Sequence, residues 1–291
     1  MQDPSTPLSY LPWFGGLVAL GFLIAAMRAA RKRRLIDGLP TCKTTGVFIG
    51  LVEVKGTAEA AAPLTSFLAA ARCVCFSWIV EEHWSRTVVE TYTDSDGKSR
   101  TRIRREDGWS TVAEGGDLIP FYLQDDDGVL LIRPHGATLE QTVVFEQTCG
   151  RGDSLYYGKG PAETIADSDH RRRFREVAIP VHAPIYVLGQ ARERPDLVAA
   201  EIAEDRHAPL FMISTRGEQQ VSRGYAWSYW VLVLLGLVLC SAGFGFGLPA
   251  VWPRPGEEWI PFALGAAVFL LVACLAWAWM VYNSLVDLRN R

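Results

Sequence analysis

The sequence predicts a mainly β soluble domain, a small barrel or sandwich, joined to three transmembrane α-helices. Two observations lead to this prediction. Charged residues are absent from three long apolar stretches, and the chain between the first two stretches is rich in strand-like segments separated by Gly- and Asp-rich turns. The average composition hides this pattern, because 49% of the 291 residues are hydrophobic, 21% are charged and the formal net charge is −3.

Each apolar stretch is long enough to cross a membrane. No Asp, Glu, Lys or Arg occurs in residues 4–27, 224–253 or 259–286. A bilayer core of roughly 30 Å needs about 20 apolar residues in a helix. The absence of charged residues argues against an ion or proton pathway through these segments. The transmembrane helices are expected at residues 11–27, 226–247 and 260–282.

The first apolar stretch is expected to remain in the protein as an anchor. A cleaved signal peptide has a basic segment before its apolar core. Here Asp3 is the only charged residue before the core, and the basic residues follow it. They are Arg28, Arg31, Lys32, Arg33 and Arg34.

These basic residues also predict the orientation, because Lys and Arg gather on the cytoplasmic side of short membrane loops. Residues 1–10 are expected outside, and the basic juxtamembrane segment 28–43 and the β domain 44–215 in the cytoplasm. The loop 248–259 would lie outside and the tail 283–291 inside. In the cytoplasm the cysteines outside the spans should stay reduced.

The β domain is predicted from strand-like segments and hairpin turns. Residues 94–98 (DSDGK) and 125–128 (DDDG) are the two clearest turns. Residues 63–71 fit a short helix or a loop, and residues 191–206 are charged and Ala-rich. The expected strands are 47–54, 72–82, 86–93, 101–105, 109–113, 119–124, 129–133, 174–179 and 186–188.

The acidic turn is interpreted as a solvated hairpin. A calcium-binding EF-hand loop with its glycine at Gly128 would begin at Leu123 and end at Pro134, and neither residue supplies the required carboxylate. The three acidic residues are Asp125, Asp126 and Asp127.

No other motif indicates a metal, a cofactor or a catalytic residue. Cys73 and Cys75 would point to the same face of a strand, but two thiolates are half of a zinc site and no second pair follows at suitable spacing. No nucleophile elbow and no Walker loop occur. Residues 150–153 (GRGD) lack the third glycine and the following helix of a dinucleotide motif.

Basic clusters at 100–105 and 171–175 are interpreted as solvated faces. Nucleic-acid binding would require exposed aromatic residues between them, and the net charge is negative. Residues 28–34 are better placed to contact anionic lipid, where each basic residue contributes about 1 kcal/mol. In the second span, Gly243 and Gly247 form a Gly-x-x-x-Gly step that permits close helix packing.

A series of short motifs resembles the GIDE domain, also called the BAM or "beside a membrane" domain, over about residues 47–214. The most specific motif is FYLQD at 121–125 followed by GVLLIRPHGA at 128–137. The others are GLVEVKG at 50–56, PLTS at 63–66, CVCF at 73–76, RE at 175–176, IP at 179–180 and IYVLG at 185–189.

The resemblance implies a membrane-proximal domain. Eukaryotic relatives are mitochondrial E3 ubiquitin ligases with a C-terminal RING. Residues 283–291 carry no Cys or His series for zinc, so ligase activity is not transferred to residues of this chain. The chain is more similar to prokaryotic members without a RING, which often neighbour LemA-type membrane proteins. This similarity predicts the plasma (inner) membrane of a prokaryote.

Two functions are therefore expected. The first is a non-catalytic sensing or scaffold protein that presents the β domain at the membrane surface. Its partners would be membrane lipids and another membrane protein, for which LemA-type proteins are candidates, or a second copy of the chain, and no nucleic acid. The basic residues that follow the first span and the two hairpins at 94–98 and 125–128 are its candidate contact sites. The alternative is a component of an E3 ubiquitin-ligase-like system whose RING lies in another chain.

Overall fold

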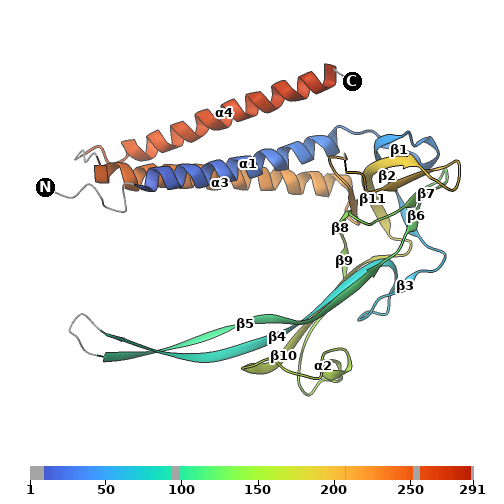
Figure 1. The fold of residues 1–291 in the computed structure, drawn as a ribbon, viewed down its shortest axis with the longest axis horizontal. Coiled ribbons are helices and arrows are strands. Elements are labelled where there is room, and N and C mark those ends of the chain that lie inside the picture. Colours follow the sequence, from blue (N-terminus) through green and yellow to red (C-terminus); the bar gives the residue numbers. More distant parts are fainter. Residues whose placement is uncertain (1–9, 94–98, 207, 252–255, 290–291) are drawn as a thin grey trace. The chain divides into compact units, whose positions relative to one another are not determined.

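The computed structural model describes residues 10–93, 99–206, 208–251 and 256–289. The chain forms two compact units (Figure 1). The helical unit contains Met1–Leu39 and Glu218–Arg291, and the β unit contains Pro40–Gly217. The predicted fold class, a mainly β domain with three long apolar helices, is confirmed.

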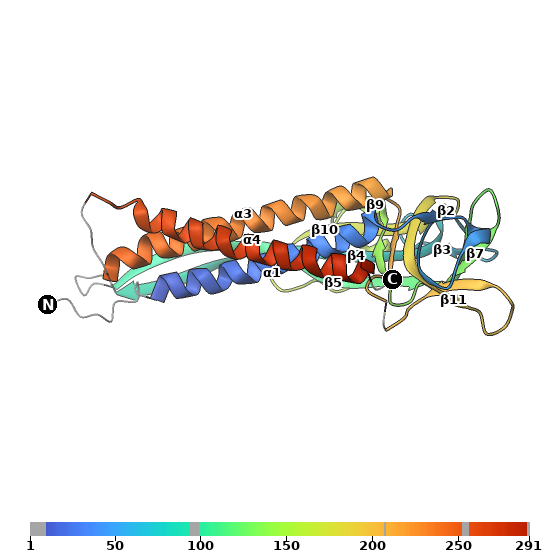
Figure 2. The same cartoon turned by 90° about the horizontal axis from the view of Figure 1, so that it is seen from above.

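Three helices make up the helical unit, and each is long and apolar enough to cross a membrane. They are α1 (Leu11–Asp37), α3 (Glu218–Val251) and α4 (Ile260–Arg289). Helix α3 packs against both α1 and α4, and α1 and α3 run side by side in both views (Figures 1 and 2). Ala19, Leu23, Cys240 and Phe269 are buried where the three helices meet. Residues 28–37 of the predicted basic segment 28–43 belong to α1, which continues without a break to Asp37.

A closed barrel forms one half of the β unit. Strands β2, β6, β7, β12 and β11 pair in that order, and β11 pairs back onto β2 to close the ring. The short strands β1, β13 and β8 extend it. The bounds are β1 Thr41–Cys42, β2 Gly50–Glu59, β6 Phe121–Gln124, β7 Val129–Ile132, β8 Thr138–Glu140, β11 Pro184–Glu193, β12 Ala200–Ala203 and β13 Met212–Ser214.

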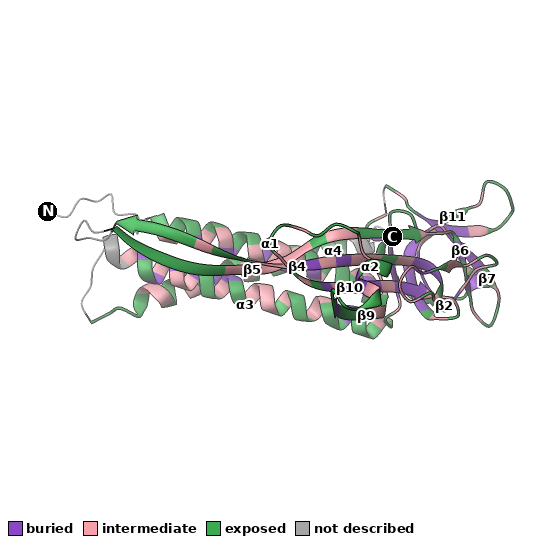
Figure 3. Cartoon of the chain, turned by 90° about the horizontal axis from the view of Figure 1, so that it is seen from below, coloured by how far each residue is buried: buried purple, intermediate pink, exposed green. Residues whose placement is uncertain are grey.

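Alternating apolar residues of these strands fill the barrel (Figure 3). Val52 and Val54 of β2, Leu123 of β6, Ile132 of β7 and Val187 of β11 are almost completely buried. The predicted hairpin at 125–128 connects β6 to β7, as its Asp-Gly signal indicates.

The second sheet is an open half-barrel. Its strands are β3 (Leu64–Thr65), β4 (Arg72–Thr93), β5 (Ser99–Leu118), β9 (Thr142–Gly150) and β10 (Ser168–Pro180). Strand β4 pairs with β3 and β5 on one side and with β10 on the other, and β10 pairs with β9. A separate core of Val80, Cys149, Tyr156 and Phe174 lies on one of its faces.

Several strand predictions for this sheet were wrong in extent. Residues 72–82 and 86–93 form one continuous strand, β4, and residues 101–105 and 109–113 both belong to β5. The expected turn at 94–98 lies outside the described residues. Residues 63–71, expected as a short helix or a loop, contain the two-residue strand β3 followed by a turn. Residues 150–153 do lead into a helix, the five-residue α2 (Ser154–Gly158), whose N-cap Asp153 accepts a hydrogen bond from the Leu155 amide.

Candidate functional site

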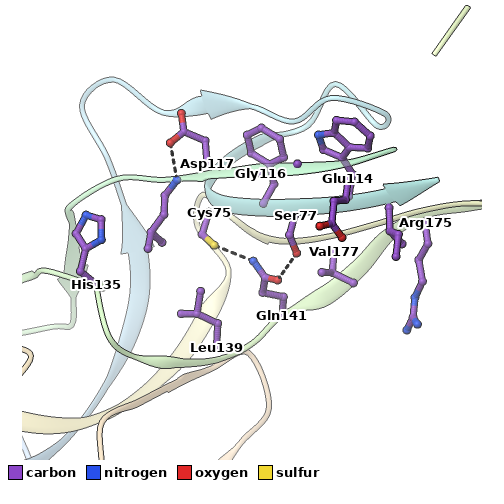
Figure 4. A pocket seen from close by; sticks show the side chains of 15 residues that line it. Cys75, Ser77, Glu114, Gly116, Asp117, His135, Leu139, Gln141, Arg175 and Val177 are labelled. Carbon is purple, nitrogen blue, oxygen red and sulfur yellow. Dashed lines mark hydrogen bonds between the residues drawn. The ribbon is translucent and has the colours of Figure 1, made fainter. Parts of the chain in front are cut away.

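An open groove of about 870 Å³ lies on the face of the half-barrel sheet formed by β4, β5 and β10 (Figure 4). Three segments far apart in the sequence meet there because their strands are neighbours in one sheet. The lining residues are 75–79, 114–118, His135, Leu139, Gln141, Arg175 and Val177.

Strand register determines which side chains form the floor of the groove. Ser77 of β4 is paired with Gly116 of β5 on one side and with Val177 of β10 on the other. Two residues along, Ile79 is paired with Glu114 and Arg175. Because residues i and i+2 of a strand share a face, these six residues lie together. The floor is therefore small and apolar, with a carboxylate at one margin and a guanidinium at the other.

Gln141 forms one end of the groove and lies between Cys75 and Ser77 (Figure 4). Its Nε2 donates to Cys75 Sγ at 2.7 Å, and its Oε1 accepts from Ser77 Oγ at 3.1 Å. The Gln141 side chain could exchange these two bonds for bonds to an incoming peptide group, because an amide offers both donor and acceptor atoms.

The thiols beside the groove are not poised for nucleophilic chemistry. Burial raises the pKa of Cys75 to about 11, and the hydrogen bond from Gln141 offsets only part of that effect. Burial, together with the charge of Glu176, likewise raises the pKa of Cys73 to about 11. Both residues therefore remain neutral thiols at pH 7, whereas a nucleophile or metal ligand must be a thiolate. In the described part of the chain, no group of three or more Cys, His, Asp or Glu side chains is arranged to hold a metal ion.

The three predicted acidic residues have different environments. Asp125 accepts hydrogen bonds from the Thr44 amide at 2.9 Å, the Thr44 hydroxyl at 2.6 Å and the amides of Asp127 and Gly128. Burial alone would raise the pKa of Asp125, but these four hydrogen bonds lower the pKa to about 2. Asp125 is thus a structural anchor of the hairpin.

Asp126 and Asp127 instead lie on either side of Lys43, each with a carboxylate oxygen 3.8 Å from Lys43 Nζ. Asp125 and Asp126 also border a depression of about 740 Å³ that Lys43 and Lys55 line. The negative charges of the turn are therefore partly balanced by the nearby lysine Lys43.

The five predicted basic residues of α1, Arg28, Arg31, Lys32, Arg33 and Arg34, are all exposed. Arg33 contacts Asp37 at 3.2 Å and Ser222 of α3 at 3.4 Å, and Lys32 Nζ lies 5.9 Å from the centre of the Tyr225 ring. Part of this basic segment therefore joins α1 to the beginning of α3.

The predicted glycine step of α3 lies at a close helix contact. A Cβ on Gly243 would be 2.9 Å from the carbonyl oxygen of Leu11 and 3.1 Å from Cα of Gly15, and Gly247 is also buried. Gly15 could not be identified as the partner from the sequence, because the three glycines of α1 (Gly15, Gly16 and Gly21) form no Gly-x-x-x-Gly step.

Comparison with known proteins adds the family. A family model described as GIDE, E3 ubiquitin ligase, matches residues 89–246, more than half of the chain. The chain belongs to the GIDE family. No curated protein and no solved structure matches it. The GIDE match begins later than the expected residue 47 and runs past 214 into α3. It includes Gln141 and the β5 and β10 sides of the groove, while residues 75–79 precede it.

The β unit also contains buried charges that were not predicted from the sequence. The basic cluster at 171–175 was interpreted as a solvated face, and for Arg172 this was wrong, because its side chain is fully buried. Arg172 binds the Glu82 carboxylate through Nε and Nη2 and donates to the carbonyl oxygens of Tyr156, Pro161 and Glu163. Strand alternation is the signal that distinguishes Arg172 from its exposed neighbour Arg171.

Proposed function

We propose that this GIDE protein is a membrane-anchored, non-catalytic scaffold whose β unit binds a segment of a membrane partner in the groove of β4, β5 and β10. The groove carries the proposal. Its apolar floor around Ile79 and Val177 offers burial for side chains, and Gln141, Glu114 and Arg175 supply polar groups around it. Binding sites commonly combine an apolar surface with a few polar groups of this kind.

Anchoring supports the same function. Only two residues separate α1 from the β unit, and α3 begins at the residue that follows it. If α1 and α3 cross the membrane, the β unit is confined to the membrane surface. Confinement raises the effective concentration of partners in that membrane. We expect the partner to be an integral membrane protein, with LemA-type proteins as first candidates, and the β unit to face the cytoplasm of a prokaryotic cell.

A second function has one specific observation in its favour. The matching family is described as E3 ubiquitin ligase, so the chain could serve a ligase system whose RING lies in another protein. The raised pKa values of Cys73 and Cys75, caused chiefly by burial, favour a binding role for the groove over thioester chemistry.

The test is affinity purification of the tagged full-length protein from its host in a gentle detergent, followed by mass spectrometry. A stoichiometric membrane protein should co-purify with the wild type. Ser77→Arg places a large charged side chain on the groove floor at an exposed position and should reduce recovery of the partner about tenfold or more, as loss of a central contact does.

Val129→Arg is the matched control, because Val129 is an exposed residue of β7 that does not line the groove. It should recover the partner as the wild type does. Equal recovery with Ser77→Arg would refute the groove as the binding site. Recovery of ubiquitin-like modifiers or their conjugating enzymes would favour the ligase function.

A further inference from the structure

The hairpin of β4 and β5 extends well beyond the rest of its sheet. Strand β10 pairs with β4 only as far as Trp84, whereas β4 and β5 remain paired from Arg86–Glu106 to Thr93–Ser99. We call residues 86–93 and 99–106 the distal arm. At about 3.4 Å per residue, its eight residue pairs give it a reach of about 25 Å.

This distal arm has little to stabilise it from within the chain. No third strand pairs with it among the residues that the structure describes. An isolated two-stranded hairpin is marginally stable in water. The arm nevertheless exposes large apolar side chains on both of its faces: Val89 (60% exposed) is paired with Ile103 (72%) on one face, and Tyr92 (49%) lies on the other. Exposed apolar side chains on an extended hairpin are typical of a contact with a membrane or with another protein.

The charged residues of the arm indicate which of these partners it contacts. Arg100, Arg102 and Arg104 are spaced by two residues and share one face of β5. Opposite them on β4 are Tyr92, Glu90 and Val88 in register. On the same face, Glu106 is already bound by Arg86 at 2.7 Å. Arg104 Nε also lies 4.0 Å from Glu106. This face therefore carries four arginines against two glutamates, Glu90 and Glu106, and keeps a positive excess of two charges.

A second copy of the chain is a poor occupant of this face, because a symmetric contact through it would oppose the arginines of one arm to those of the other. An anionic bilayer fits better. Guanidinium groups bind phosphates in a bidentate manner, and tyrosine side chains favour the headgroup level. Three helices that could span a membrane would also hold the β unit near a bilayer.

We propose that the distal arm lies on the anionic headgroups of the membrane that holds the helices, with Arg100, Arg102 and Arg104 on lipid phosphates and Tyr92 among the headgroups. The contact is independent of the groove, because the arm begins nine residues along β4 from Ser77. Lipid contact would cover one face of the arm, which no third strand and no second layer of the described β unit supports.

The test uses the full chain in nanodiscs of phosphatidylcholine alone, or of three parts phosphatidylcholine to one part phosphatidylglycerol. Hydrogen–deuterium exchange is followed in peptides that cover 86–93 and 99–106. Each arginine near an anionic surface shifts a binding equilibrium about fivefold, so the three together should slow exchange of the arm by at least about tenfold on the anionic discs. Peptides of β11 should exchange equally on both.

Two matched triple variants separate charge from structure. Arg100→Gln, Arg102→Gln and Arg104→Gln together should abolish the difference between the discs, whereas the three Arg→Lys substitutions should keep most of it. Ser77→Arg should leave it unchanged, so failure of the groove proposal would not affect this result. Equal exchange on both discs, or slowing that persists in the Gln variant, would overturn the proposal. Slowing that depends on protein concentration instead of lipid charge would assign the arm to a second copy.

Discussion

At the scale of single residues, the buried carboxylates Glu82 and Glu176 of the β unit each accept several hydrogen bonds. Glu82 accepts from Tyr156, Ser168 and Arg172, and Glu176 accepts from the Ser66 hydroxyl and from the amides of residues 67–69. Among the residues that the structure describes, no buried side-chain nitrogen or oxygen lacks a hydrogen-bond partner. Such groups are costly to bury and more costly to leave half-satisfied.

Arg172→Met should lower the free energy of unfolding by about 3–5 kcal/mol, because it leaves the buried Glu82 carboxylate without a cation. The double variant Glu82→Leu with Arg172→Met removes both charges. We expect it to be destabilised by less than the sum of the two single variants, with a difference of at least about 1 kcal/mol. Thermal melts of the purified chain measure all three variants, and strict additivity would contradict the ion-pair interpretation.

Asp125→Asn should destabilise the protein at pH 7 and not at strongly acidic pH. The hydrogen bonds from Thr44, Asp127 and Gly128 lower the pKa of Asp125 from 3.8 to about 2, against the effect of burial. A carboxyl group whose pKa is lowered by folding stabilises the folded state at pH values above its ordinary pKa. This stabilisation is lost as the pH falls from about 4 to about 2. Because the turn is partly exposed, the effect is about 1 kcal/mol or less.

The control for Asp125 is Asp126→Asn on the same turn, whose carboxylate is exposed beside Lys43. Its melting temperature should differ from that of the wild type by little at either pH. A pH-independent loss of stability in Asp125→Asn would show that the carboxylate does not act through its charge.

At the scale of elements, the sequence predicted best where one residue pattern dominates. The three helices were predicted because membrane-spanning segments must be apolar on all sides, and the 125–128 hairpin because Asp-Gly favours a tight turn. Strand β5 appeared broken because it contains Gly108, Gly115 and Gly116, whereas the predicted break in β4 at residues 83–85 contains no glycine. The structure gives two of these glycines a packing role: a Cβ on Gly115 would lie 2.9 Å from the Trp78 ring, and one on Gly108 would lie 3.1 Å from the Trp84 ring.

The groove could not be predicted in the same way. Its floor brings together residues 77, 116 and 177, and only the register of β5, β4 and β10 makes them neighbours. No local pattern in a single sequence encodes that register. The acidic turn and the basic end of α1, which were predicted from local composition, are separate from the groove.

One glycine at a strand crossing allows a sharp test of packing. A Cβ on Gly56 of β2 would lie 2.2 Å from the carbonyl oxygen of Gln124 and 2.6 Å from a methyl group of Leu123. Gly56→Ala should therefore force β2 and β6 apart and cost about 1–3 kcal/mol of stability. Gly46→Ala is the control, since nothing lies within 4 Å of its added Cβ, and it should change stability by less than about 0.5 kcal/mol. Similar melting temperatures for the two variants would refute the close contact.

At the scale of the whole molecule, the chain is a β unit inserted between α1 and α3 of a three-helix unit. The arrangement predicts one topology if the basic residues at 28–34 and Arg223 mark the cytoplasmic ends of α1 and α3. The β unit and the C-terminus would then share the cytoplasm, and the connection between α3 and α4 would lie outside.

Reporter fusions test this topology. Green fluorescent protein attached after Arg291 should fluoresce, because it folds in the cytoplasm, and alkaline phosphatase attached after residue 258 should be active, because it requires the outside. Dark fluorescent-protein fusions together with inactive phosphatase fusions would invert the orientation and place the β unit outside. The anionic cytoplasmic leaflet would then no longer be available to the distal arm.

The close contact of Gly15 with Gly243 has a consequence for synthesis on the ribosome. About 180 residues separate the end of α1 from the start of α3, so at about 5–20 residues per second the synthesis of α3 begins roughly 9–36 s after α1 is complete. Throughout that interval the glycine-bearing side of α1 has only lipid or the insertion machinery against it. The β unit emerges and folds while held at its N-terminal end alone, and α3 joins α1 only afterwards.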